Sequence, residues 1–276
     1  MAEIRIESAL IDNISCLILS GKLLEPAPLI FFVHGFASDK RQGIPLGVEL
    51  AKKGFICVSI DTVHRGERVG QDFDPTTGPD FQPVYPEGTG LDGFITMLKM
   101  VRQTDLDIQS LIEYFSTDSR IDPVRVGMVG YSMGGWATFY SAAYNPAIKA
   151  AVSIAGTPCS GERWADVLLE CSTYPEWDLE LEKVEQETLK RTAFIQEIDP
   201  YPIIVEKFPV PLLMICGDVD TIAPKKYNLD LYQQILEKHH PDPERLKLSV
   251  YDGIGHQLDL NMAEETAAWL KHIFDQ

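Results

Sequence analysis

The sequence predicts an α/β protein with a doubly wound, mostly parallel sheet and an inserted helical cap. Three observations predict this fold class. Short apolar runs recur along the chain, stretches with the apolar spacing of helices separate them, and polar residues directly follow several of the runs. Runs that are apolar throughout are typical of strands covered on both faces, and their alternation with helices is typical of a parallel sheet.

The chain begins with a hairpin and then alternates between strands and helices. Residues 3–20 alternate loosely between apolar and polar side chains, as an antiparallel edge hairpin does. Residues 62–90 are rich in glycine, proline and aspartate and are expected to form a loop. Buried strands are expected at 29–33, 55–60, 124–129, 150–155, 211–216 and 246–251. Helices are expected at 44–53, 91–115, 135–144, 225–239 and 257–274.

The pattern divides the chain into a main domain and a cap. Residues 1–156 and 209–276 carry the alternation and are expected to form one α/β domain. Residues 157–208 interrupt it and mix aromatic with acidic residues, which predicts a cap of two or three helices over the sheet. Trp164, Tyr174 and Trp177 could line a substrate pocket, or they could only pack the cap against the domain.

The composition argues against several classes of partner. The chain has 276 residues and a net charge of −17, which disfavours binding to nucleic acid or to an anionic membrane. It has no apolar run of membrane-spanning length and no secretory signal pattern, so we expect a cytoplasmic protein. Its five cysteines are scattered, and no histidine and cysteine cluster suggests a metal site. We expect no metal and no cofactor, and the oligomeric state stays open.

Residues 130–134 read Gly-Tyr-Ser-Met-Gly and lie between an expected strand and an expected helix. In that setting the pattern G-x-S-x-G forms a nucleophile elbow, a sharp turn that exposes the serine, here Ser132. The glycines are required because the turn brings backbone segments too close together for a Cβ atom. The five-residue pattern is common by chance, so its interpretation depends on finding the partners that a nucleophilic serine needs.

A serine hydroxyl needs a histidine to take its proton and a carboxylate to orient that histidine. His256 follows the last expected strand, and Asp218 and Asp220 follow the strand before it. All three therefore lie at the carboxyl ends of strands, where the sites of parallel sheets form. Asp220 is the favoured acid because it lies further into the loop and could reach the imidazole, whereas Asp218 abuts the strand end.

Hydrolysis through a tetrahedral intermediate also needs two N–H donors where negative charge develops. The backbone N–H of Met133, directly after the serine, is the first expected donor. The second is expected from Phe36, in the loop after the first central strand. In that loop Gly35 would allow the chain to turn the amide inward, and His34 would orient the loop rather than transfer protons.

With these residues the chain resembles members of the α/β-hydrolase superfamily. Within that superfamily it resembles the serine esterases related to dienelactone hydrolase and prolyl oligopeptidase. The resemblance covers about residues 25–275 apart from the cap, and it implies the triad Ser132, Asp220 and His256. Dienelactone hydrolase itself has a cysteine nucleophile, so its particular reaction is not implied. The matching segments are His34-Gly35-Phe36, Asp61 with His64-Arg65-Gly66, residues 121–135, Gly217 with Asp220 and Pro224, and Gly255-His256.

The segment after Asp61 departs from the family, which often has Gly-His-Gly where this chain has His64-Arg65-Gly66. Arg65 and Glu67 could therefore be structural, or Arg65 could hold a carboxylate of the substrate.

The sequence thus predicts a serine hydrolase that cleaves carboxylic esters with short or medium acyl groups through an acyl-enzyme. Two alternatives stay open. The same triad could cleave thioesters or small peptide amides, or the hydrolase fold could serve as a non-catalytic ligand-binding protein.

Overall fold

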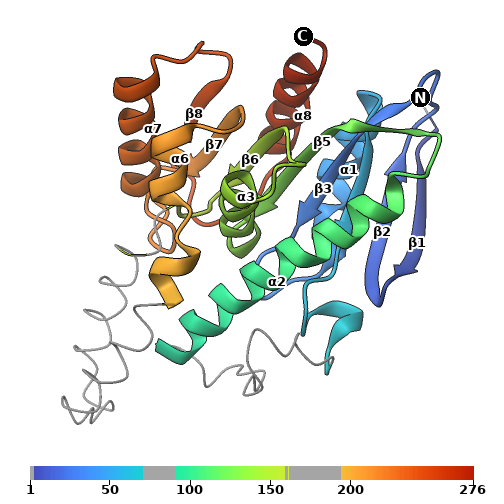
Figure 1. Ribbon diagram of the computed structural model, residues 1–276, viewed down its shortest axis with the longest axis horizontal. Helices are drawn as coiled ribbons and strands as arrows, with labels where there is room; N and C mark the ends of the chain where they lie inside the picture. The colour runs from blue at the N-terminus through green and yellow to red at the C-terminus, as the bar shows by residue number, and fades with distance from the viewer. Residues whose placement is uncertain (1–2, 71–90, 159–160, 162–193) are drawn as a thin grey trace.

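One eight-stranded sheet runs through the described part of the protein. The computed structural model describes residues 3–70, 91–158, 161 and 194–276. The strand order is β1-β2-β4-β3-β5-β6-β7-β8 (Figure 1). β2 is antiparallel to both of its neighbours, β1 and β4. The six strands β3 to β8 run parallel to one another. The strands are β1 (Arg5–Ile11), β2 (Ile14–Ser20), β3 (Ala27–Val33), β4 (Ile56–Ile60), β5 (Ile121–Tyr131), β6 (Ala150–Ile154), β7 (Leu212–Gly217) and β8 (Leu246–Tyr251).

Helices cover both faces of this sheet. α1 (Ile44–Lys52) and α8 (Leu260–Phe274) lie on one face, where they contact each other. The other face carries α2 (Leu91–Phe115), α3 (Met133–Tyr144), α6 (Tyr201–Lys207) and α7 (Lys225–His239), as Figure 1 shows. Two short 3₁₀ helices, η1 (Lys40–Gly43) and η2 (Gly66–Arg68), lie in the loops after β3 and β4.

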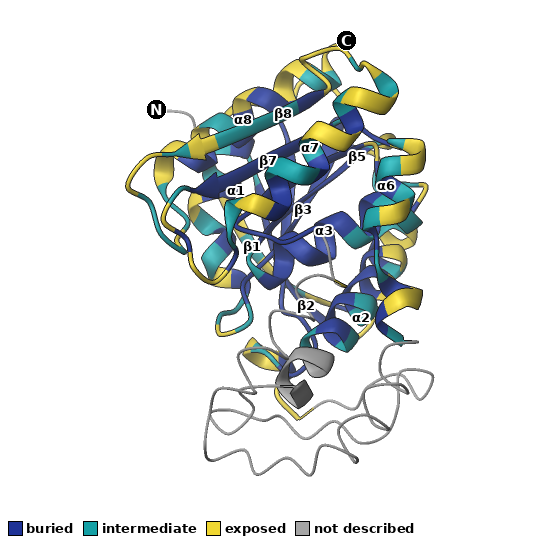
Figure 2. Ribbon diagram, turned by 90° about the vertical axis from the view of Figure 1, so that its left-hand side faces the viewer, coloured by how far each residue is buried: buried dark blue, intermediate teal, exposed yellow. Residues whose placement is uncertain are grey.

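The core consists of apolar side chains from both sides of the sheet. All seven residues of β3 are buried, and the central strands form the dark band in Figure 2. Neighbouring side chains of a strand point to opposite faces. Accordingly, Phe31 packs in the cluster that includes residues of α2, while Phe32 packs in the cluster that includes residues of α1 and α8. This burial on both faces is the reason why the strands read as continuous apolar runs.

The expected fold class is confirmed, with small differences at the ends of elements. The closing helix was expected from residue 257, but α8 begins at Leu260. The side chain of Asp259 accepts a hydrogen bond from the N–H of Met262, so it caps the helix and fixes this start. β5 begins at Ile121 rather than at residue 124 and continues into the elbow.

The expected cap at 157–208 lies mostly outside the described residues, so its place over the sheet stays a prediction. Residues 194–198 are helical, and Ile195 and Ile198 are buried in the same core cluster as residues of α2 and α3. Further along, α6 packs against α3 and α7. The described end of this segment therefore contributes to the core of the main domain.

None of the helices within the described residues is both long and apolar enough to cross a membrane.

Candidate active site

Ser132 lies at the turn between β5 and α3, in a backbone conformation that residues other than glycine rarely adopt. Its φ is 56° and its ψ is −115°, and its N–H donates to the carbonyl oxygen of Ile154 at 2.9 Å. A Cβ atom on Gly130 would lie 1.9 Å from the carbonyl oxygen of Gly134, and one on Gly134 would lie 2.0 Å from that of Val33. The two glycines of the motif are therefore required by close backbone contacts, as the sequence predicts.

The structure brings three side chains from separate loops into one chain of hydrogen bonds. His256 Nδ1 lies 2.8 Å from Asp220 Oδ2, and His256 Nε2 lies 2.8 Å from Ser132 Oγ. An ionised carboxylate can only accept, so Nδ1 of the imidazole carries the proton and donates it to Asp220. In the neutral ring Nε2 is then an acceptor, and the Ser132 hydroxyl donates to it. This is the arrangement in which a histidine can take the serine proton.

The loop after β7 holds Asp220 as an ionised acceptor. Its side chain is fully buried, and its Oδ1 accepts from the N–H groups of Ile222 and Ala223, both at 2.8 Å. Burial by itself raises the pKa of this carboxyl. The hydrogen bonds from His256 and from the two backbone amides outweigh burial, so the pKa of Asp220 lies below its ordinary value.

Asp218, the other acid considered from the sequence, has a different environment. Its backbone N–H donates to the carbonyl oxygen of Tyr251 at 3.0 Å, which joins this loop to β8. Its Oδ1 is buried without a hydrogen-bond partner. Asp220, and not Asp218, is therefore the acid that contacts His256.

Close backbone contacts also bring the loops after β7 and β8 together. A Cβ atom on Gly217 would lie 2.0 Å from the carbonyl oxygen of Ile254, and the N–H of Val219 donates to the same oxygen at 3.2 Å. From the elbow, the Tyr131 hydroxyl donates to the carbonyl oxygen of His256 at 2.9 Å. Sequence reasoning did not find this role for Tyr131, because the x positions of the elbow motif carry no residue preference.

The loop after β3 lies directly against the serine. A Cβ atom on Gly35 would lie 3.4 Å from Ser132 Cβ, and the N–H of Gly35 donates to Gln42 Oε1 at 2.8 Å. The carbonyl oxygen of Gly35 lies 2.7 Å from His34 Nδ1 and also accepts from the N–H of Ser38 at 3.0 Å. This carbonyl belongs to the same peptide unit as the N–H of Phe36, so these contacts fix the direction of that N–H.

His34 orients this loop as a neutral side chain. The N–H of Thr62 donates to His34 Nε2 at 3.1 Å, so Nδ1 must carry the proton that is donated to Gly35. Burial lowers the pKa of His34 and outweighs the contacts that would raise it, so the ring stays uncharged at neutral pH. These contacts agree with the expected orienting role.

Arg65 binds the backbone of the loop that carries Phe36. Its Nε donates to the carbonyl oxygen of Phe36, and its Nη1 donates to that of His64 at 2.9 Å. Its guanidinium carbon also lies 4.2 Å from the centre of the Phe36 ring, within range of a cation–π interaction. These are structural contacts, and they leave the expected contact with a substrate carboxylate as a prediction.

An ion cluster joins the loops after β3 and β4. Asp61 is completely buried, and its two oxygens accept from the backbone N–H and the Nζ of Lys40, at 2.8 and 2.7 Å. Glu67 accepts from the Ser15 hydroxyl at 2.6 Å, and its carboxylate lies 3.2 Å from Lys40 Nζ. Glu67 therefore has the structural role that was one of the two expected possibilities. Lys40 was missed, because nothing in its sequence context distinguishes it from a surface lysine.

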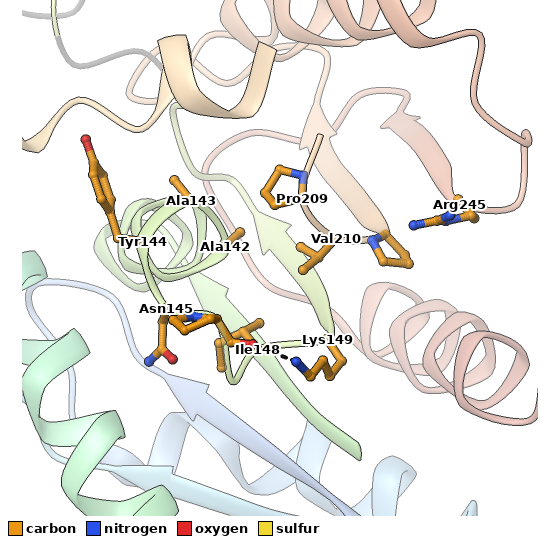
Figure 3. Close-up of a pocket in the computed structure, with 11 residues that line it drawn as sticks. Ala142, Ala143, Tyr144, Asn145, Ile148, Lys149, Pro209, Val210 and Arg245 are labelled. Carbon is orange, nitrogen blue, oxygen red and sulfur yellow. Dashed lines mark hydrogen bonds between the residues drawn. The ribbon is translucent and has the colours of Figure 1, made fainter. Parts of the chain in front are cut away.

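The other expected substrate-binding residues, Trp164, Tyr174 and Trp177, lie outside the described residues. The described ranges contain no group of three or more side chains suited to hold a metal ion. A groove of about 620 Å³ lies at the amino ends of β6, β7 and β8, whereas Ser132 follows the carboxyl end of β5 (Figure 3). Tyr144, Lys149 and Arg245 line it, and it contains none of Ser132, Asp220 and His256.

Comparison with known proteins identifies the family. A family model described as "Dienelactone hydrolase family" matches residues 33–267, which include the elbow and the loops of Asp220 and His256. The chain belongs to the dienelactone hydrolase family. As a member, it is a hydrolase with the α/β-hydrolase fold.

One relative in sequence and one of the similar solved structures are named as esterases. The chain is 26% identical over 245 residues to YitV of Bacillus subtilis, named "Putative esterase", and the match covers 88% of each protein. Among solved structures, TT1662 from Thermus thermophilus has a TM-score of 0.70 at 20% identity and covers 99% of both chains. Acetyl xylan esterase 1 from Thermoanaerobacterium has a TM-score of 0.64 at 16% identity, covering 99% of this chain and 89% of its own.

The close approach of Gly134 to β3 can be tested by measuring stability. Gly134→Ala is expected to lower the free energy of unfolding by about 3 kcal/mol, because the new Cβ would lie 2.0 Å from the Val33 carbonyl oxygen. Urea denaturation followed by circular dichroism measures this loss. Gly255→Ala is the control, since a Cβ there meets no atom within 4 Å. Equal stability of the two variants would contradict the account of the elbow.

Proposed function

We propose that this family member is a serine esterase that hydrolyses carboxylic esters with short or medium acyl groups through an acyl-enzyme. The observation that carries the proposal is the continuous chain from Asp220 through His256 to Ser132, with 2.8 Å at both contacts. The esterase names of the relatives support the same class of reaction.

In the first half of the reaction His256 acts as the base. Its Nε2 takes the proton of Ser132 Oγ as that oxygen attacks the ester carbonyl carbon, and a tetrahedral intermediate forms. The charge of the resulting imidazolium is stabilised by Asp220, which stays ionised because its pKa is lowered. The imidazolium then gives the proton to the leaving alcohol, and the acyl group remains on Ser132.

In the second half a water molecule replaces the alcohol. His256 takes a proton from this water, the hydroxide attacks the acyl carbon, and the proton returns to Ser132 Oγ as the carboxylic acid leaves. Both halves develop negative charge on the carbonyl oxygen, which the backbone N–H groups of Met133 and Phe36 are proposed to stabilise. Met133 is the first residue of α3, so its N–H has no acceptor within the helix and lies at the positive end of the helix dipole.

The type of acyl bond is tested by comparing substrates with the same acyl group. A p-nitrophenyl ester, a thioester and an anilide differ in how strongly the leaving group must be protonated by His256. We expect ester cleavage to have the highest kcat/KM of the three. A preference for the thioester or the anilide would favour one of those activities of the same triad instead. Absence of all three activities, together with no labelling of Ser132 by a fluorophosphonate, would favour a non-catalytic binding protein.

The nucleophile is tested with Ser132→Ala. We expect kcat for ester cleavage to fall by about 10⁴-fold or more, because no acyl-enzyme can form. The melting temperature should change little, since within the described residues the hydroxyl forms a hydrogen bond only with His256. Electrospray mass spectrometry of the wild type during turnover should detect the acyl adduct on Ser132. An unchanged kcat in the variant would refute the proposed mechanism.

The acid is tested with Asp220→Asn, using Asp218→Asn as the matched control in the same loop. We expect Asp220→Asn to lower kcat by about 10⁴-fold, because an amide holds the imidazole in the wrong tautomer. Asp218→Asn should keep kcat within severalfold, since Asp218 does not contact His256.

The wild type and Asp220→Asn also test the pH dependence of stability. The folded-state pKa of Asp220 is lower than its unfolded value. The stabilisation that the ionised carboxylate contributes is therefore fully present at pH values above the unfolded pKa. This contribution is lost as the pH falls through the lowered pKa. The stability difference between wild type and Asp220→Asn should therefore shrink below about pH 4. A difference that grows on acidification would contradict the lowered pKa.

Arg65 is proposed to position the Phe36 amide. Arg65→Met should lower kcat by about 10- to 100-fold with little change in KM, because misplacing one of the two donors weakens binding of the transition state more than of the substrate. Arg65→Lys should recover little of this loss, since an ammonium group lacks the planar contact with the Phe36 ring. Substrates with and without a carboxylate decide between the two expected roles. A rise in KM confined to acidic esters would instead indicate that Arg65 binds the substrate.

A further inference from the structure

The proposed reaction leaves unexplained the open edge of the sheet at β1. Within the described residues β1 pairs only with β2, and Figure 1 shows it at the right-hand margin of the sheet with no labelled element beyond it. Edge strands expose unpaired N–H and C=O groups, and proteins usually protect them with charged side chains, proline or a bulge. β1 contains no proline, its two charged side chains are of opposite sign, and its register with β2 is unbroken from Arg5 to Ile11. It also exposes two large apolar side chains, Ile6 at 47% and Leu10 at 69%.

The hydrogen bonds within the sheet identify the backbone groups that β1 leaves unused. The N–H of Asp61 donates to the carbonyl oxygen of Ser15 at 2.9 Å, so Ser15 and the other odd residues of β2 turn toward β4. The even residues of β2 therefore turn toward β1, where their partners are Arg5, Glu7, Ala9 and Ile11. Because backbone groups alternate along an antiparallel strand, those of Ile6, Ser8 and Leu10 point away from the sheet.

We propose that two copies of this chain associate through β1, paired antiparallel about a two-fold axis at Ser8. The eight strands of each copy would then form one continuous sheet. In this register the three residues with outward backbone groups face one another, with Ser8 opposite Ser8 and Ile6 opposite Leu10 of the other copy. Each such pair exchanges two hydrogen bonds, and the contact is the same for both copies, as a two-fold interface requires.

The apolar side chains of β1 fit this pairing. Ile6 and Ser8 lie opposite Leu19 and Leu17 of β2, which belong to the core cluster that includes residues of α1. Ile6, Leu10 and that cluster therefore share one face of the sheet. The cross-strand contact of Ile6 with Leu10 would continue the apolar layer of this face from one copy into the other.

The charge of β1 also favours a second copy over an oppositely charged partner. The strand carries one positive and one negative side chain, Arg5 and Glu7, which lie 3.5 Å apart and neutralise each other. The whole chain has a net charge of −17, so most symmetric contacts between two copies would bring like charges together. A contact centred on β1 brings two neutral strands together.

Cysteine cross-linking tests the register directly. The two-fold axis at Ser8 places the Cα atoms of the two Ser8 residues about 5.5 Å apart, within the range that a disulfide spans. Ser8→Cys should therefore give a disulfide-linked dimer under mild oxidation. Ile6→Cys alone should not, because it faces Leu10, whereas Ile6→Cys with Leu10→Cys should.

The wild-type chain, oxidised in the same way, is the control for disulfides that native cysteines could form. Cys16, Cys57 and Cys216 are buried, and burial raises the pKa of Cys57 to about 12, so these thiols are expected to be unreactive. Mass spectrometry of the linked peptides identifies the bond.

Sedimentation velocity tests the association without a cross-link. Leu10→Lys should weaken dimerisation at least tenfold, while Val124→Lys, which replaces an equally exposed side chain at 69%, should not. Both variants should keep the ester cleavage of the wild type, since β1 is four strands away from β5 and Val124 lies near the amino end of β5, away from the end that leads into Ser132.

Three results would each overturn the proposal. These are a wild type that stays monomeric throughout the micromolar range, cross-linking of Ile6→Cys alone in place of Ser8→Cys, and a Leu10→Lys dimer as strong as the wild type. None of them bears on the catalytic proposal, which loss of activity in the triad variants tests separately.

Discussion

The candidate site depends on backbone segments that approach each other more closely than any side chain permits. Gly134 lies against the end of β3, and Gly217 lies against the loop after β8. These contacts set the distances between the loops before any catalytic side chain is considered. With a Cβ at Gly217, the loops of Asp220 and His256 would have to separate, and the 2.8 Å contact between them could not form. The parallel sheet supports this arrangement, because it directs the carboxyl ends of its strands to one edge.

The strain at Ser132 follows from the same crowding. A positive φ is costly for a residue with a Cβ, and it persists only where the surroundings determine it. Here the N–H of Ser132 is held by Ile154 and its hydroxyl by His256, so both ends of the residue are fixed. The result is a hydroxyl that faces the imidazole at the start of a helix, whose dipole favours negative charge at that position.

Much of this could be predicted from the sequence because it depends on local patterns. Runs such as 29–33 read as buried strands, and the spacing of glycines around Ser132 indicates an elbow, which is present in the structure. The sequence favours Asp220 over Asp218, because Asp220 lies further into the loop after the strand, and in the structure it is Asp220 that contacts His256. Lys40 and Tyr131 could not be found, because their roles depend on partners distant in the sequence and on no motif. The position of the expected cap at 157–208 stays a prediction, because most of that segment lies outside the described residues.

The loops after β3 and β4 show why charged residues are buried beside this site. A loop cannot satisfy its polar backbone groups as a strand does, so other groups must bind them. Asp61 accepts from the backbone N–H groups of Lys40 and Glu67, and Arg65 donates to the Phe36 carbonyl oxygen. Buried ion pairs add little net stability, because desolvation offsets most of their attraction. Their value here is geometric, since the bonds to Lys40 and Phe36 fix peptide planes in the loop that would direct the Phe36 N–H toward the reacting oxygen, and the bond from Glu67 fixes one in the neighbouring loop after β4. A site that stabilises a transition state by fixed dipoles needs such support more than it needs added stability.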